Sequence, residues 1–162
     1  MKYAAFFLIV CVLVVGCVAG YELMNTQLQV TGQGLSVIAA TDRAEEFQVL
    51  QTAMSRNSLE GTVFQSGELS AAENYTFKIY TLRLKNNGLL PAEMIEIQLS
   101  PDASDILYYE EGEEIDIAAG ATRDVWVSLL TQDTTGSTAR DLYLTYYIWG
   151  HPISMKFTYS GS

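Results

Sequence analysis

Acidic side chains are the most concentrated candidates for chemistry in this sequence. Seven of them fall between residues 102 and 116, at Asp102, Asp105, Glu110, Glu111, Glu113, Glu114 and Asp116. Calcium binds carboxylate oxygens from neighbouring loops, so it is the ion that this cluster would take. The spacing, however, is not the regular one of a calcium-binding loop. We therefore expect a solvated acidic hairpin whose charges oppose pairing with other chains.

Nitrogen and sulfur ligands are scarce. His151 is the only histidine and lies between Gly150 and Pro152, where we expect a turn. The two cysteines, Cys11 and Cys17, both belong to an apolar amino-terminal segment. A Ser-His-Asp site would therefore have to use His151, which we expect in a turn instead. The rest of the chain lacks the residues for a Cys-His site, a transition-metal site or a disulfide. We expect no enzyme and no cofactor.

Aromatic side chains form a stripe on the last long predicted strand. The stripe consists of Tyr143, Thr145, Tyr147 and Trp149. These residues alternate with mostly aliphatic ones along the strand, so their side chains share one face. The more common arrangement is a strand covered on both faces, here by a helix expected over 43–56. The alternative is an exposed platform for a glycan or a protein partner, for which Tyr143, Tyr147 and Trp149 are the candidates. Exposure of Tyr147 and Trp149 would favour that alternative.

The segment from Tyr3 to Tyr21 carries no charge and follows Lys2. As a helix it would reach about 28 Å, close to the hydrocarbon thickness of a bilayer. Lys2 favours the cytoplasmic side, so the acidic remainder would lie outside the cell membrane. We predict a single-pass membrane anchor over residues 1–22.

Two alternatives to an uncleaved anchor stay open. The residues Val14-Val15-Gly16-Cys17 resemble the lipobox of bacterial lipoproteins, which implies an acylated Cys17 as the new amino terminus. A cleaved export signal also begins with a positive residue and an apolar run. The first of these still tethers the domain to the membrane, whereas the second releases it.

The net charge of the chain is −10. A phosphate-rich partner would be repelled, so we expect no binding of nucleic acid. The apolar fraction of 49% is high enough for a folded core. The expected partners are the membrane and a protein at the cell envelope.

Beyond the anchor at residues 1–22, the pattern of the apolar residues divides the chain into three further parts. Residues 23–41 are polar and interrupted by glycine, and we expect a stalk and a first strand. Residues 42–57 predict an accessory helix, with Asp42 and Glu45 at the spacing of a capping box. Residues 58–162 alternate with a period of two, which predicts an all-β, antiparallel two-sheet sandwich. In the strand at 75–85 the apolar phase switches between Ile79 and Tyr80, which predicts a bulge.

Two stretches carry a resemblance to a known family. Leu82-Arg83-Leu84-Lys85-Asn86-Asn87-Gly88 reads as a strand entering a turn, and Ile115 to Thr122 precedes the strand Val125-Trp126-Val127. These patterns resemble CARDB-like and related immunoglobulin-like domains of prokaryotic surface proteins. The resemblance implies an immunoglobulin-like fold outside the cytoplasm and names no ligand.

The function expected from these features is a non-enzymatic, membrane-anchored sandwich for protein interaction or assembly at the cell envelope, with a surface appendage as one setting. The alternative is a ligand-binding lipoprotein anchored through Cys17, which would need a pocket between helix and sheet.

Overall fold

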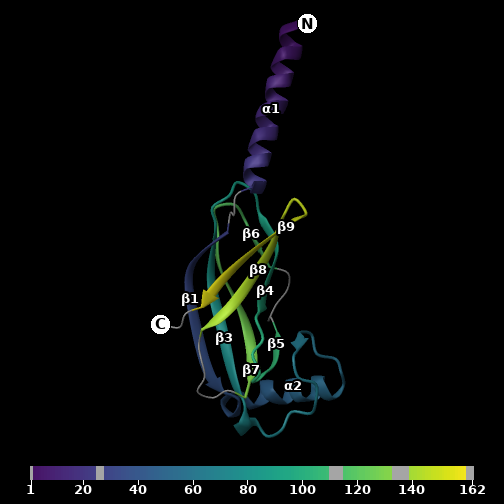
Figure 1. The fold of residues 1–162 in the computed structure, drawn as a ribbon, viewed down its shortest axis with the longest axis vertical. Coiled ribbons are helices and arrows are strands. Elements are labelled where there is room, and N and C mark those ends of the chain that lie inside the picture. Colours follow the sequence, from purple (N-terminus) through teal and green to yellow (C-terminus); the bar gives the residue numbers. More distant parts are fainter. Residues whose placement is uncertain (1, 25–27, 110–114, 133–138, 160–162) are drawn as a thin grey trace.

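The computed structural model describes residues 2–24, 28–109, 115–132 and 139–159 of the chain. Its amino-terminal helix, α1 (Lys2–Met24), extends away from one end of a β-sandwich (Figure 1). The uncharged part of α1, Tyr3–Tyr21, has a mean hydropathy of 2.6, and none of it is buried. It is long and apolar enough to cross a membrane, a test that a signal sequence also passes.

Two antiparallel sheets form the body of the protein, which confirms the prediction of an all-β protein. The five-stranded sheet has the order β1-β3-β7-β5-β2, and the four-stranded sheet has the order β6-β4-β8-β9. The strands are β1 (Leu28–Ala39), β2 (Thr62–Val63), β3 (Thr76–Asn86), β4 (Ala92–Leu99), β5 (Asp105–Tyr109), β6 (Ile115–Ile117), β7 (Thr122–Thr131), β8 (Arg140–Ile148) and β9 (His151–Tyr159).

The main core lies between the two sheets. Every second residue of β8, and of β3 from Tyr80 to Leu84, points into it, as Leu144 and Tyr146 of β8 do. The ring of Tyr80 meets that of Tyr159 edge-on, with 5.5 Å between the centroids. The alternation seen in the sequence thus corresponds to the inner faces of the two sheets.

A second core lies on the outer face of the five-stranded sheet, under α2 (Ala44–Ser55). Phe47 and Leu50 of this helix are buried against Phe77 of β3 and Leu130 of β7. The helix sits at the end of the sandwich opposite α1 (Figure 1). It therefore does not cover the aromatic stripe of β8, which belongs to the other sheet.

The bulge predicted for β3 is wrong. The register of β3 with β7 is continuous from Thr76 to Lys85. Both phases of β3 are apolar because one faces the other sheet and the second, through Phe77, faces α2. A register shift does occur in the neighbouring strand β1, between Val30 and Gly32.

Residues 23–41 contain less stalk than we expected. Strand β1 pairs with β3 from Leu28 to Ala39, and a 3-10 turn, η1 (Ala40–Arg43), leads directly into α2. The expected capping box is also not formed, because the helix begins after Arg43 without a side-chain cap. Instead Arg43 forms an ion pair with Glu46 at 2.8 Å. A second short turn, η2 (Ala72–Asn74), precedes β3.

Candidate functional site

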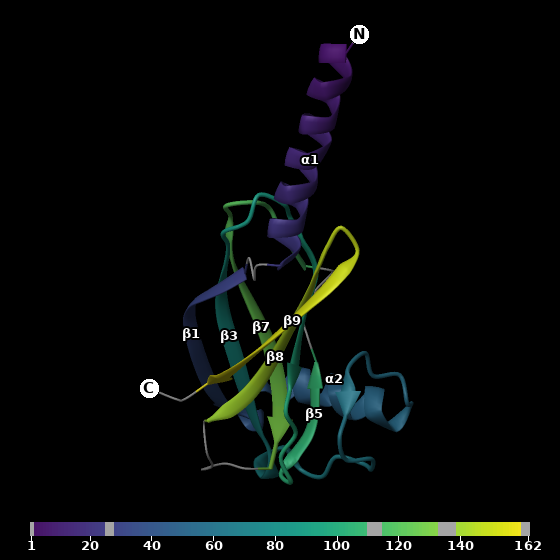
Figure 2. The ribbon, with the colours of Figure 1, turned by 45° about the horizontal axis from the view of Figure 1, so that its top comes forward.

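The outer face of the four-stranded sheet is open and carries the predicted aromatic residues. Tyr143 is 41% exposed and Tyr147 is half-buried. In the register of the sheet, Tyr143 lies between Gln98 of β4 and Lys156 of β9, and Tyr147 lies between Glu93 and Pro152. In Figure 2, β8 and β9 lie across the front of the sandwich while α2 lies behind β5. The face is therefore a solvated surface of aromatic and polar side chains.

A small charged network surrounds Tyr143. The Lys156 ammonium lies 5.7 Å from the centroid of the Tyr143 ring and forms an ion pair with Asp141 at 2.9 Å. Thr158 also donates a hydrogen bond to Asp141, at 2.7 Å. The bond from Thr158, with the nearby Lys156, lowers the pKa of Asp141, and the bond to Asp141 raises the pKa of Lys156. These groups stay ionised at neutral pH, so they offer recognition and no proton transfer.

Trp149 is placed differently from the two tyrosines. It is the first residue of a two-residue turn with Gly150, since Ile148 pairs with His151 across β8 and β9. Both turn residues have positive φ, +51° at Trp149 and +75° at Gly150. The turn that we expected at His151 is thus wrongly placed. The turn consists of Trp149 and Gly150, and His151 already begins β9. The indole is 60% exposed at the tip of this hairpin.

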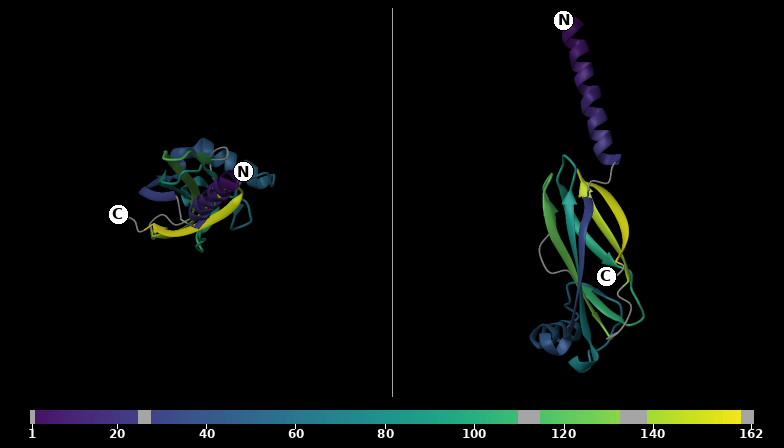
Figure 3. Two further views of the ribbon diagram at one scale, coloured as in Figure 1. Left: turned by 90° about the horizontal axis from the view of Figure 1, so that it is seen from above. Right: turned by 90° about the vertical axis from the view of Figure 1, so that its left-hand side faces the viewer.

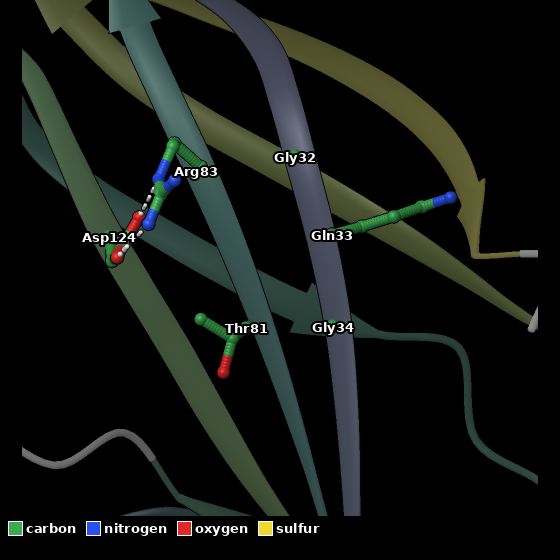
Figure 4. Close-up of a pocket in the computed structure, with 6 residues that line it drawn as sticks. All are labelled: Gly32, Gln33, Gly34, Thr81, Arg83 and Asp124. Carbon is green, nitrogen blue, oxygen red and sulfur yellow. Dashed lines mark hydrogen bonds and ion pairs between the residues drawn. The ribbon is translucent and has the colours of Figure 1, made fainter. Parts of the chain in front are cut away.

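A shallow groove of about 250 Å³ lies on the outer face of the other sheet (Figure 4). Gly32 and Gly34 leave the backbone of β1 uncovered there, beside Arg83 and Asp124. Arg83 donates two hydrogen bonds to Asp124, at 2.8 and 2.9 Å. This bidentate pair lowers the pKa of Asp124 and raises the pKa of Arg83. Because the two charges satisfy each other, the groove offers no general acid or base.

A deeper pocket of about 510 Å³ lies between the end of α2 and β2. Its apolar lining includes Met54, Leu59, Val63 and Phe64. This volume falls in the range of small-molecule sites. The sequence pattern did not single out these residues, because only the packing of α2 beside the short strand β2 brings them together.

The acidic cluster does not converge among its described members. Asp105 is fully buried and binds Arg140, whereas the Asp116 carboxylate accepts a hydrogen bond from the backbone N–H of Met94 at 2.9 Å. Glu110, Glu111, Glu113 and Glu114 lie outside the described residues. Within the described ranges, no group of three or more His, Cys, Asp and Glu side chains could hold a metal ion.

Comparisons with known proteins leave the family open. No family model and no curated protein sequence matches the chain. Several solved structures match at low similarity. A FixG-related protein from Vibrio parahaemolyticus is 14% identical, over 81% of this chain and 97% of that one, with a TM-score of 0.35.

Two further structures are similar to a comparable degree. The GAE domain of GGA2p from Saccharomyces cerevisiae is 8% identical, over 63% of this chain and 97% of that one, with a TM-score of 0.40. The cupredoxin domain of amoB from Nitrosocaldus yellowstonii is 13% identical, over 85% of this chain and 89% of that one, with a TM-score of 0.35. At these scores the likenesses carry no argument about function.

Proposed function

We propose that this protein is a non-enzymatic, membrane-anchored sandwich that binds a protein partner on the extracytoplasmic side of the cell envelope. The observation that carries the proposal is the open outer face of the four-stranded sheet. Tyr143 is 41% exposed there, because α2 covers the other sheet instead. Tyrosine contributes strongly to protein interfaces, since it combines a large apolar area with a polar tip.

The membrane part of the proposal rests on α1. A helix with an uncharged stretch from Tyr3 to Tyr21 matches the thickness of a bilayer, and the preceding Lys2 favours an amino terminus in the cytoplasm. We further propose that the sandwich is immunoglobulin-like and related to CARDB-like domains of surface proteins. The two antiparallel sheets and the turn at Asn86 to Gly88 support this assignment.

Site-specific photo-crosslinking in native membranes tests the partner face. A photoreactive residue in place of Tyr143 should give a discrete crosslinked product. The same residue in place of Val49, which is 67% exposed on α2, should give none. The double variant Tyr143→Ser and Tyr147→Ser should abolish co-purification of the crosslinked partner. Equal crosslinking from both positions, or none from Tyr143, would refute a specific role for this face.

The second candidate function is a ligand-binding lipoprotein anchored through Cys17. The pocket between α2 and β2 favours it, because its volume suits a small molecule and its lining combines apolar side chains with the polar Asn57 and Ser66. Mass spectrometry of the mature amino terminus separates the two. An acylated Cys17 supports the lipoprotein, an intact chain supports the helical anchor, and a start beyond residue 18 eliminates both tethered forms. A Cys17→Ala variant that keeps its membrane attachment would also count against the lipoprotein.

A further inference from the structure

Three turns meet at the end of the sandwich that follows α1. They are residues 87–91 between β3 and β4, 118–121 between β6 and β7, and 149–150 between β8 and β9. The register of the strands brings them together. Leu28, the first residue of β1, pairs with Asn86, and the backbone N–H of Asn86 donates to the Ala121 carbonyl at 2.9 Å. In the other sheet, Ala92 pairs with Ile117 and Glu93 pairs with Tyr147.

The figures agree with this register. The tip of the β8–β9 hairpin lies at the α1 end of the sandwich in the first view and again after a rotation by 90° about the vertical axis (Figures 1 and 3). Helix α2 lies at the opposite end in both views. The two ends of the sandwich can therefore be compared by composition.

The three turns contain no Asp, Glu, Lys, Arg or His, although the chain has 28 Lys, Arg, Asp and Glu residues, 9 basic and 19 acidic. The opposite end is strongly acidic. In and around η1, α2 and the loops beside them, two basic residues, Arg43 and Arg56, stand against seven acidic ones: Asp42, Glu45, Glu46, Glu60, Glu68, Glu73 and Asp102. The three turns beside α1 are thus uncharged, although the exposed Lys85, Asp116 and Arg123 flank them, and acidic residues gather at the opposite end.

Two large apolar side chains are exposed in these uncharged turns. Leu89 is 71% exposed, and Trp149 is 60% exposed. Trp149 also occupies a position with φ of +51°, where glycine or asparagine is the usual residue. A tryptophan held in an unfavourable backbone conformation at an exposed tip is typical of a site selected for contact.

The turn that carries Leu89 is held firmly. The Asn86 side chain is fully buried, and its Nδ2 donates to the carbonyls of Leu90 and Ile117 at 2.8 and 3.0 Å. Its Oδ1 accepts a hydrogen bond from the Gly88 N–H at 2.9 Å. This amide therefore joins the first turn to strand β6, which itself ends at the second turn.

The connection to α1 is short. Helix α1 ends at Met24 and β1 begins at Leu28. Four residue steps of fully extended chain span at most about 14 Å. If α1 crosses a bilayer up to Tyr21, the three remaining helical residues add about 5 Å, so the end of the sandwich that carries Leu28 and Asn86 lies within roughly 20 Å of the membrane surface.

We propose that this end of the domain is seated on the bilayer that α1 crosses, with Trp149 and Leu89 in the interfacial layer. The proposal rests on the membrane anchor of the proposed function and assigns Trp149 to lipid instead of to the protein partner. Tryptophan prefers the headgroup region, where its ring is apolar and its N–H finds hydrogen-bond acceptors. Uncharged turns avoid the cost of desolvating charges at that surface.

Two exposed apolar side chains suffice because the domain is already tethered. A short linker turns the second contact into an intramolecular one at high effective concentration. A domain seated in this way presents its acidic end away from the membrane. The face that carries Tyr143 then stands roughly perpendicular to the bilayer, since β8 runs from that acidic end toward α1 (Figure 1).

Tryptophan fluorescence in vesicles tests the proposal, because the chain has two tryptophans. The full chain is reconstituted into phosphatidylcholine vesicles in which part of the lipid is brominated near the headgroup. Trp126→Phe leaves Trp149 as the reporter, and Trp149→Phe leaves Trp126 on β7 as the matched control. We expect the brominated lipid to quench most of the emission in the first variant and little of it in the second.

Two outcomes would overturn the proposal, and they are distinguishable. If the chain stays with the vesicles after an alkaline wash but Trp149 is quenched by aqueous iodide and not by the lipid, the seating is wrong and the anchor stands. If the chain is released by the wash, the anchor and the seating both fail. Should Trp126→Phe fold poorly, the unaltered chain replaces it, and it should lose more emission than Trp149→Phe does. Adding Leu89→Asp to either Trp149-containing chain should reduce the quenching by lipid.

Discussion

Arg140 of β8 reaches Asp105 of β5 through a buried ion pair that joins the two sheets. The Arg140 Nη1 donates to Asp105 Oδ2 at 2.7 Å, and Nη2 donates to Oδ1 at 3.3 Å. The two side chains are 7% and 0% exposed. Burial alone would lower the pKa of Arg140, but the charge of Asp105 and the nearby Tyr80 raise it above its usual value. The Arg140 guanidinium therefore keeps its positive charge inside the sandwich.

Removal of one partner from this pair should be costly. We expect Asp105→Asn to lower the free energy of unfolding by about 3–5 kcal/mol, because it leaves the Arg140 charge buried without a counter-ion. Urea denaturation of the full chain in detergent, followed by circular dichroism, measures the change. The double variant Asp105→Leu and Arg140→Met should recover most of the loss, and a double variant as unstable as the single one would contradict this account.

The buried Asn86 amide makes a second local prediction. Asn86→Ala leaves the Leu90 and Ile117 carbonyls without their side-chain donor, so we expect a loss of about 2 kcal/mol in the free energy of unfolding. The adjacent Asn87 is exposed and provides the control. Asn87→Ala should change the stability by less than about 0.5 kcal/mol. Equal effects at the two positions would show that the amide of Asn86 is not the link between the turns.

The turn at Trp149 should be more stable without tryptophan. Asparagine tolerates a positive φ far better, so Trp149→Asn should raise the free energy of unfolding by about 1 kcal/mol. The same variant should lose the contact with lipid proposed above. Thermal unfolding of the two chains in the same detergent measures the gain, and a destabilised Trp149→Asn variant would mean that the indole packs on the domain.

Alkaline pH should destabilise the contact between α2 and β5. Burial raises the pKa of Tyr109, and the hydrogen bond from its hydroxyl to Glu46 raises it further. A raised pKa in the folded state gives stability that is complete below the ordinary value near 10 and lost as the pH rises above it. Tyr109→Phe should flatten the fall in stability above about pH 10. Denaturation curves at several pH values test this, and an unchanged profile would assign the loss to Tyr80, whose pKa burial also raises.

Substitutions on the buried and the exposed face of α2 test where this helix packs. Phe47 is buried, and its ring lies 5.4 Å from that of Tyr75, whereas Val49 is exposed. Phe47→Ala should cost about 3–5 kcal/mol through the cavity it leaves. Val49→Ala on the opposite face should cost less than about 0.5 kcal/mol. Similar costs in urea denaturation would show that α2 does not pack on the five-stranded sheet.

The strands that face the main core could be predicted from sequence, because alternation along β8 and β9 records which side chains point inward. Strand β1 was harder. It lies at an edge, its glycines add no apolar phase, and its identity depends on pairing with β3, which lies far along the chain. The wrong prediction of a bulge in β3 has a related cause. The apolar residues on the second face of β3 pack against α2, which comes from another part of the chain, and do not mark a local bulge.

The candidate site was predicted only in part. The aromatic residues were found because they share a phase, but whether α2 covered them depended on which sheet the helix contacts. Trp149 was assigned to the strand face, although the turn begins one residue earlier than the Gly150-His151-Pro152 signal suggested. Leu89 was not singled out at all, because a single leucine in a turn carries no pattern.

The pairing of β1 with β3 also governs how the domain bears mechanical load. If α1 is anchored in a membrane, a pull on the domain away from that membrane enters at Leu28, the first residue of β1, and acts along the axis of β1. Backbone hydrogen bonds between antiparallel strands lie perpendicular to that axis. The ladder from Leu28 to Ala39 is therefore loaded in shear, so its bonds share the force and do not open one after another.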